Sequence, residues 1–133
     1  MDRKRSSPDV HFPFGHDLTA SRDARAAIDP LLSDDDPIAG DVQLAVSEMV
    51  TNVVRHTNDG GLLEAWDPKP DVPLRVEVSD TNQLPVQLAE QRPGGQGGHG
   101  LHIVDAVSDS WGVDLTSDGK TVWAEFDRNR RSD

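Results

Sequence analysis

Residues 36–56 read DPIAGDVQLAVSEMVTNVVRH, and the rest of the chain is expected to fold around them. Asp36 can accept a hydrogen bond from an N–H group of a first helical turn, and Pro37 supplies a fixed backbone angle where no donor is needed. Apolar residues then recur at the spacing of one helical stripe: Ile38, Val42, Ala45, Val46, Met49, Val50 and Val53. The segment therefore predicts a helix with one face in the core.

Three polar residues follow a second line along this helix. Glu48, Asn52 and His56 are spaced four positions apart, so their side chains stack one above the other. At about 100° per residue, this line runs beside the apolar stripe rather than opposite it. We therefore expect the three side chains to line the wall of a pocket.

The composition limits the class of protein. A chain of 133 residues, 35% of them hydrophobic and 28% charged, can form one domain with a core but not two. We expect this domain at residues 9–127, a disordered tail at residues 1–8 and a charged tail at residues 128–133. No apolar run reaches the length of a membrane span or a signal peptide, which predicts a cytoplasmic protein with no membrane partner.

The charge and the missing cysteines exclude further classes. A net charge of −11 argues against nucleic acid as a partner, because clustered Lys and Arg provide most of the affinity for a phosphate backbone. The absence of cysteine excludes disulfides and thiolate metal sites. A small anionic ligand remains compatible, since the N–H groups of a helix start and a bound cation can hold phosphate at any net charge.

The order of the remaining elements indicates the architecture. Alternation, helical periodicity and turn signals predict a strand at 9–14, a helix from Thr19 or Ser21 to about Leu32, the central helix, strands at 62–66 and 74–79, a loop at 81–96, a short helix near 101–107, and strands near 111–115 and 122–126. The predicted class is therefore α+β, a two-layer sandwich with a mixed sheet covered on one face by helices.

Two more features point to a ligand. Asp80 continues the alternation that places Val76 and Val78 on the buried face of their strand. A carboxylate is costly to bury there unless another group donates hydrogen bonds to it. Glycines cluster at residues 94–100 before a short helix, where the backbone can approach a ligand and N–H groups are oriented. The amide oxygen of Asn52 suits Mg²⁺, and Glu48 could accept a proton from an attacking hydroxyl. Together these groups suit a purine nucleotide with Mg²⁺.

Four motifs in this order resemble the ATP-binding domains of the Bergerat (GHKL) fold. Within that superfamily the chain looks most like the bacterial anti-sigma factor serine kinases of the actinobacterial type, over roughly residues 10–127. The matching motifs are EMVTNVVRH at 48–56 for the N-box, VSD at 78–80 for the adenine motif, GHGL at 98–101 through Trp111-Gly112 for the end of the lid and the following helix, and GKTVW at 119–123 for the closing strand.

The resemblance implies an ATP- and Mg²⁺-dependent serine kinase that sequesters a sigma factor and phosphorylates a small antagonist protein. Homodimerisation is also implied as possible. Glu48 would be the general base, Asn52 the Mg²⁺ ligand and Asp80 the adenine acceptor. The remaining implied nucleotide contacts are Gly98, His99, Gly100 and Leu101 at the phosphates, and Thr121 in support of the adenine site. His56 fits either a contact with the phosphate region or a role in packing or capping the helix end.

Two departures from the family pattern leave alternatives open. The family often has Asp-x-Gly at the adenine motif, whereas this chain has Asp80-Thr81-Asn82, and Arg92 is the only cation of the expected lid. These features keep a nucleotide-dependent binding module without catalysis as the second hypothesis. A detached histidine-kinase-like catalytic domain ranks third, because the chain shows no helix pair that would carry a phosphoacceptor histidine.

Overall fold

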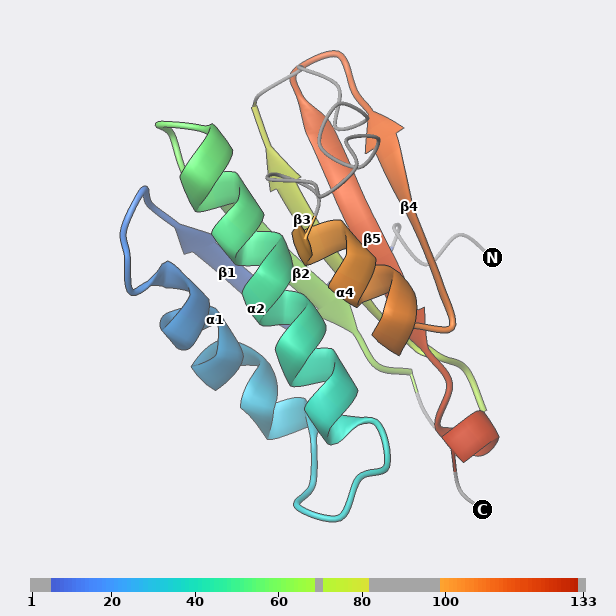
Figure 1. Ribbon diagram of the computed structural model, residues 1–133. Coiled ribbons are helices and arrows are strands. Elements are labelled where there is room, and N and C mark those ends of the chain that lie inside the picture. Colours follow the sequence, from blue (N-terminus) through green and yellow to red (C-terminus); the bar gives the residue numbers. More distant parts are fainter. Residues whose placement is uncertain (1–5, 69–70, 82–98, 132–133) are drawn as a thin grey trace.

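The computed structural model describes residues 6–68, 71–81 and 99–131. In chain order the elements are β1 (Val10–Phe14), α1 (Ala20–Ile28), the 3-10 helix η2 (Asp29–Leu31), α2 (Ala39–His56), β2 (Gly61–Trp66), β3 (Leu74–Asp80), α4 (His99–Val107), β4 (Ser110–Leu115), β5 (Lys120–Phe126) and the 3-10 helix η3 (Arg128–Arg131). Figure 1 shows α1, α2 and α4 side by side on one face of the sheet. The predicted α+β two-layer sandwich is confirmed.

The five strands form one sheet in the order β1-β2-β3-β5-β4. Among the described residues, every neighbouring pair of strands is antiparallel, so the expectation of a mixed sheet was wrong. The reason is the place of β5. It forms a hairpin with β4 and lies between β4 and β3, which separates the two strands that run in the same direction.

The core lies between the helices and the sheet, and α2 contributes its predicted stripe. Val42, Ala45, Val46, Met49, Val50 and Val53 are all buried. The helix begins at Ala39 rather than at Pro37, although the Asp36 carboxylate does accept a hydrogen bond from the N–H of Ile38 at 3.2 Å. Each fully buried valine or methionine contributes about 1.5–3 kcal/mol, so this stripe is a main source of stability.

The first helix is shorter than predicted. α1 begins after Thr19, whose side chain makes no capping bond, and the carboxylate of Asp17 instead accepts hydrogen bonds from the N–H and hydroxyl of Thr19. The helix ends at Ile28 because Pro30 supplies no N–H for an α-helical bond. The chain continues as a 3-10 turn to Leu31.

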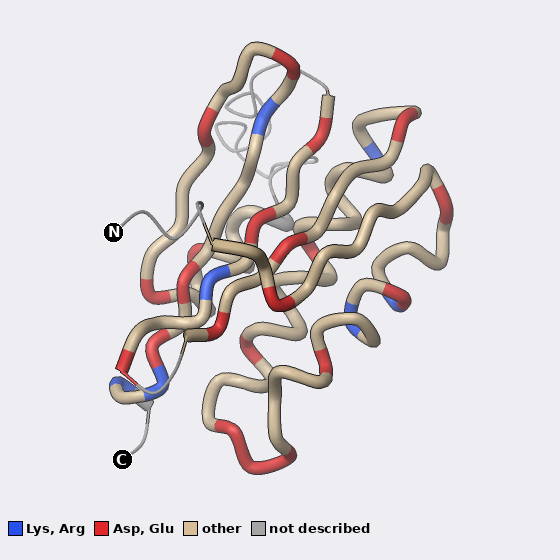
Figure 2. Tube along the Cα trace, turned by 180° about the vertical axis from the view of Figure 1, so that it is seen from behind, with Lys and Arg blue, Asp and Glu red and all other residues tan. Residues whose placement is uncertain are grey.

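The sheet face away from the helices carries charged side chains. Figure 2, seen from this side, shows acidic positions spread along the strands and loops with few basic ones between them. Arg75 lies 4.4 Å above the ring of Trp123 and donates to Glu77 at 2.8 Å and Glu125 at 2.9 Å. Burial opposes the charge of Arg75, but its hydrogen bonds to the two glutamates outweigh that effect and raise its pKa. Arg75 thus remains a cation inside an acidic cluster.

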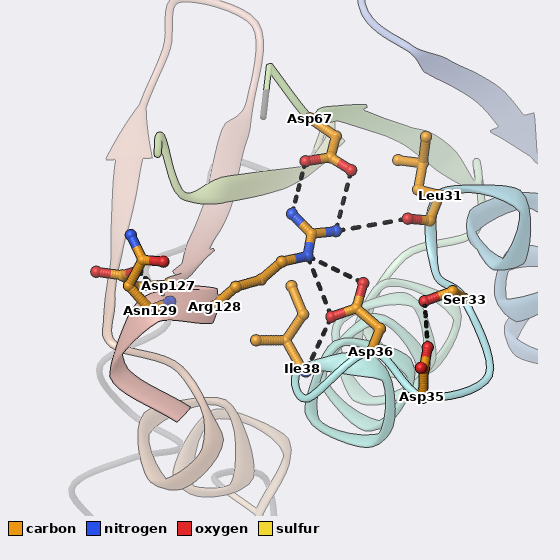
Figure 3. Close-up of polar contacts among 9 residues, drawn as sticks. All are labelled: Leu31, Ser33, Asp35, Asp36, Ile38, Asp67, Asp127, Arg128 and Asn129. Carbon is orange, nitrogen blue, oxygen red and sulfur yellow. Dashed lines mark hydrogen bonds and ion pairs between the residues drawn. The ribbon is translucent and has the colours of Figure 1, made fainter. Parts of the chain in front are cut away.

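Arg128 directly follows the expected domain boundary at residue 127, and its side chain packs against the rest of the fold. The guanidinium of Arg128 donates through Nε to both oxygens of Asp36, at 3.1 and 3.0 Å, and through its two terminal nitrogens to Asp67, at 2.9 and 3.1 Å (Figure 3). These carboxylates are almost fully buried, with 5% and 2% of their side chains exposed. Arg128 therefore fastens the chain end to the segment before α2 and to the end of β2.

A glycine holds the hairpin of β4 and β5 against β3. A Cβ atom at Gly119 would lie 1.8 Å from the carbonyl oxygen of Asp80, so no larger residue fits without movement of the backbone. We expect Gly119→Ala to destabilise the protein by about 1–3 kcal/mol, the usual cost of overpacking. Gly40→Ala is the matched control: nothing lies within 4 Å of its added Cβ, and alanine favours the helix by about 0.5–1 kcal/mol. Equal melting temperatures for the two variants would contradict this account.

None of the helices within the described ranges has both the length and the apolar character required to cross a membrane.

Candidate functional site

The orientation of α2 places the predicted line of polar residues on the side of α4. Gln43 marks the opposite side, because its amide donates to the carboxylate of Asp29 at 3.2 Å, directly after α1. Asn52 follows Gln43 by about two and a half helical turns and so points the other way, and Glu48 lies one turn before Asn52. Figure 1 shows α2 between α1 and α4. Glu48 and Asn52 therefore lie on the flank of α2 that meets α4.

The exposure of this line increases toward the helix end. Glu48 and Asn52 are half-buried, while His56 is exposed in the last turn of α2. A half-buried carboxylate or amide can still reach a ligand, and it keeps part of its packing against the helix. The structure thus places Glu48 and Asn52 together beside α4, with His56 farther out.

Asp80 ends β3 on the face of the sheet that the helices cover. It shares that face with Val76 and Val78, which are buried in the core. Its carboxylate has 3% of its side-chain surface exposed and faces the ammonium of Lys120, which lies 3.1 Å from each of its two oxygens. The hydrogen-bond donor that the sequence analysis required for a buried Asp80 is therefore a charged lysine on the neighbouring strand.

Thr121 lies on the other face of the sheet. Its hydroxyl is 2.9 Å from that of Ser79, and the register pairs Thr121 with Ser79 and Lys120 with Asp80. Because successive side chains of a strand point to opposite faces, the structure does not bring the Thr121 side chain to Asp80. Any support from Thr121 for the adenine site would pass through Ser79 and the backbone.

The start of α4 carries the other predicted contacts. Gly98 lies outside the described residues, as does Arg92, while His99 and Gly100 form the first turn of α4. Leu101 is buried with 2% exposure, so it packs inside the fold. The indole N–H of Trp111 donates to Asp105 at 2.8 Å and ties α4 to β4. A helix start has N–H groups without helical acceptors and a partial positive charge, which suit a phosphate.

The donor set fits a magnesium nucleotide. The Asn52 amide offers one oxygen, and helical geometry places Asn52 on the flank of α2 opposite Gln43. Mg²⁺ commonly takes few protein ligands, with phosphate oxygens and water completing its shell. Glu48 is one turn away and can accept a proton, and Asp80 can accept a hydrogen bond from an exocyclic amine. No sequence pattern marks Lys120 as a partner of Asp80, because only the register of β3 and β5 shows that the two residues face each other.

Comparisons with known proteins agree with this description. The sequence profile of the histidine kinase-like ATPase domain matches residues 17–126. The crystal structure of the RsbU and RsbW domains of Rv1364c from Mycobacterium tuberculosis is similar, with a TM-score of 0.64 and 20% identity over 92% of this chain and 32% of that chain. The histidine kinase domain of the blue-light activated histidine kinase EL346 from Erythrobacter litoralis gives a TM-score of 0.53 and 22% identity over 71% of this chain and 46% of that chain.

The two solved structures support the fold of this chain, and the sequence profile supports its family. This chain spans less than half of each solved chain, and identities of 20% and 22% establish the fold alone. No curated protein sequence matches the chain. The profile, in contrast, covers most of the chain and includes α2, β3, α4 and β5. The protein therefore belongs to the histidine kinase-like ATPase domain family, of the GHKL type that its motifs predict.

Proposed function

We propose that this protein is an ATP- and Mg²⁺-dependent serine protein kinase that acts in the cytoplasm as an anti-sigma factor. It would sequester a sigma factor and phosphorylate a small antagonist protein. The proposal is supported by one observation: Glu48 and Asn52 lie on the flank of α2 that meets α4. Both residues belong to the segment that matches the ATPase domain profile. A general base and a magnesium ligand one helical turn apart suit phosphoryl transfer, where positioning and electrostatics provide most of the catalysis.

Each residue would have one task in the reaction. Asp80 accepts a hydrogen bond from the exocyclic amine of adenine, and the N–H groups at the start of α4 hold phosphate oxygens. Asn52 would hold Mg²⁺, and the ion would neutralise negative charge on the phosphates. Glu48 accepts the proton of the serine hydroxyl while the serine oxygen bonds to the γ-phosphorus and ADP leaves. The products are ADP and a phosphoserine on the antagonist.

The proposed partners rest on the resemblance and on one structural neighbour. The M. tuberculosis chain contains an RsbU and an RsbW domain together, so a fold like this one occurs there beside a second domain. A partner-switching role is compatible with a single domain of this size. The test is phosphate transfer from labelled ATP to a serine of a candidate antagonist. Phosphorylation should then dissociate the complex between this protein and the antagonist.

Calorimetric titration with ATP and ADP, with and without Mg²⁺, tests the site before any partner is known. We expect binding that strengthens with Mg²⁺, and we expect Asn52→Ala to remove this strengthening. Even outer-shell groups support metal affinity by about 10- to 100-fold, so the loss for a direct ligand should be at least that large. Asn58→Ala, at an exposed residue after α2, should behave like the wild type. Unchanged Mg²⁺ dependence in Asn52→Ala would remove this assignment.

A second function is favoured by the adenine motif. The chain has Asn82 where the family often has glycine, and Arg92 is the only cation in the sequence of the expected lid. A nucleotide-dependent binding module without catalysis would use the same site to change its affinity for a protein partner. Nucleotide binding without phosphate transfer to any candidate antagonist would favour this function.

A further inference from the structure

We propose that Lys120 is a specificity-determining residue that reads the base together with Asp80. This inference deepens the proposed function, because it presumes that a nucleotide base binds at Asp80. In it, Asp80 accepts a hydrogen bond from the exocyclic amine of adenine, and the ammonium of Lys120 donates to the adjacent ring nitrogen N1. The recognising edge is then a carboxylate and an ammonium side by side, rather than a carboxylate alone.

The pair is built into the sheet. Asp80 and Lys120 are directly opposite each other in the antiparallel ladder of β3 and β5, and both point to the helix-covered face. Both are buried, with 3% and 9% of their side chains exposed. Glycine is required at position 119 beside this pair, because an added Cβ atom would lie 1.8 Å from the carbonyl oxygen of Asp80. The two side chains therefore lie next to each other at the same end of the sheet.

A neutral base would not displace this ammonium. The nitrogen of Lys120 lies 3.1 Å from both oxygens of Asp80, and a charge-assisted hydrogen bond is about twice as strong as one from a neutral donor. Separation of a buried ion pair leaves uncompensated charges, which is strongly unfavourable. A carboxylate has about four lone-pair directions, so it can accept from the ammonium and from an amine. The base is thus expected to bind to the intact pair.

The intact pair also defines which base fits. Adenine presents a donor, its amine, next to an acceptor, N1, and this order is complementary to an acceptor next to a donor. Guanine in the same orientation presents O6 to the carboxylate and N1–H to the ammonium, so both contacts become repulsive. A site whose polar groups are buried discriminates strongly against a ligand that leaves them unpaired. Lys120 would therefore increase the preference for adenine over guanine.

The test compares ADP with 1-deaza-ADP, in which C–H replaces N1, by calorimetry on the full chain. In the wild type we expect the analogue to bind roughly 10- to 100-fold more weakly, the range of a hydrogen bond from a charged donor. In Lys120→Met, ADP should lose a similar factor and the analogue should lose nothing further. Preference for ADP over GDP should fall in the same variant.

Arg75→Met is the matched control, because it also removes a buried cation between carboxylates on β3 and β5, but on the other face of the sheet. It should destabilise the fold and keep the full penalty for 1-deaza-ADP. If Lys120→Met does not fold, Lys120→Arg retains a donor and should retain the penalty, and the wild-type comparison needs no variant.

The outcomes separate this inference from the proposed function. Wild-type binding of ADP and 1-deaza-ADP with equal affinity, or an unchanged penalty in Lys120→Met, would overturn the role of Lys120 while the nucleotide site stands. Tighter ADP binding in Lys120→Met would also overturn it, since the ammonium would then compete with the base. A wild type that binds no nucleotide would remove the proposed function and this inference with it.

Discussion

Glu48→Gln is expected to reduce phosphate transfer from ATP to a serine about 10²- to 10⁴-fold, the usual contribution of a general base. Glutamine has nearly the shape of glutamate but cannot accept a proton from the serine hydroxyl. Binding of ADP should stay within about 3-fold of the wild type, because the proposed role of Glu48 involves the serine hydroxyl and not the nucleotide. The measurement is single-turnover transfer of labelled phosphate, with calorimetry for ADP.

Glu64→Gln is the control for this prediction. It also removes one carboxylate, but Glu64 lies on β2 and contacts His11 on β1, away from α2. Its transfer rate should equal that of the wild type. If Glu48 were only a solvated residue at the edge of a core helix, Glu48→Gln would transfer phosphate at the wild-type rate. Equal rates in Glu48→Gln and Glu64→Gln would therefore exclude Glu48 as the base.

The second large effect is on stability. Arg128→Met should lower the free energy of unfolding by about 3–5 kcal/mol, the range for removal of one partner of a buried ion pair. The variant leaves the carboxylates of Asp36 and Asp67 buried and without their guanidinium. For a domain of this size the melting temperature should fall by roughly 10 °C or more. Denaturant unfolding and thermal melting both measure the effect.

Two variants test whether charge burial is the cause. Arg130→Met removes a cation two positions along the same 3-10 helix, but its side chain is 67% exposed and its carboxylate partner Asp109 is 3.5 Å away, so the loss should be below about 1 kcal/mol. The triple variant with Arg128→Met, Asp36→Asn and Asp67→Asn should recover part of the lost stability, because it no longer buries two carboxylates without the guanidinium. No recovery would mean that packing rather than charge is lost.

The contacts of Arg128 also affect how stability depends on pH. Its hydrogen bonds to Asp67, and then those to Asp36, raise the pKa of Arg128 against the opposing effect of burial. A raised pKa in the folded state stabilises the protein at pH values below the ordinary pKa of a guanidinium, and this contribution is lost as the pH rises through the folded value. The contacts of Arg128 with Asp36 and Asp67 should therefore stabilise the fold at neutral pH.

The sequence by itself determined the central helix and the family. A buried stripe repeats every 3.6 residues, so Val42, Val46 and Val53 could be assigned to the core from spacing alone, and the polar line of Glu48 and Asn52 followed from the same geometry. The motifs of α2, β3 and β5 predicted the GHKL fold because each is a short contiguous pattern. Helix ends were less certain, since Thr19 makes no capping bond and α1 stops near Pro30.

The tertiary structure alone decided which residues meet. Lys120 and Asp80 are paired by the insertion of β5 between β3 and β4, and a shift of one position would have put Thr121 opposite Asp80 instead. Arg128 reaches Asp36 across most of the chain, a contact that no local pattern encodes. Periodicity is a property of neighbouring residues, whereas strand register and long-range ion pairs depend on how the whole chain packs, so these contacts could not be predicted from the sequence.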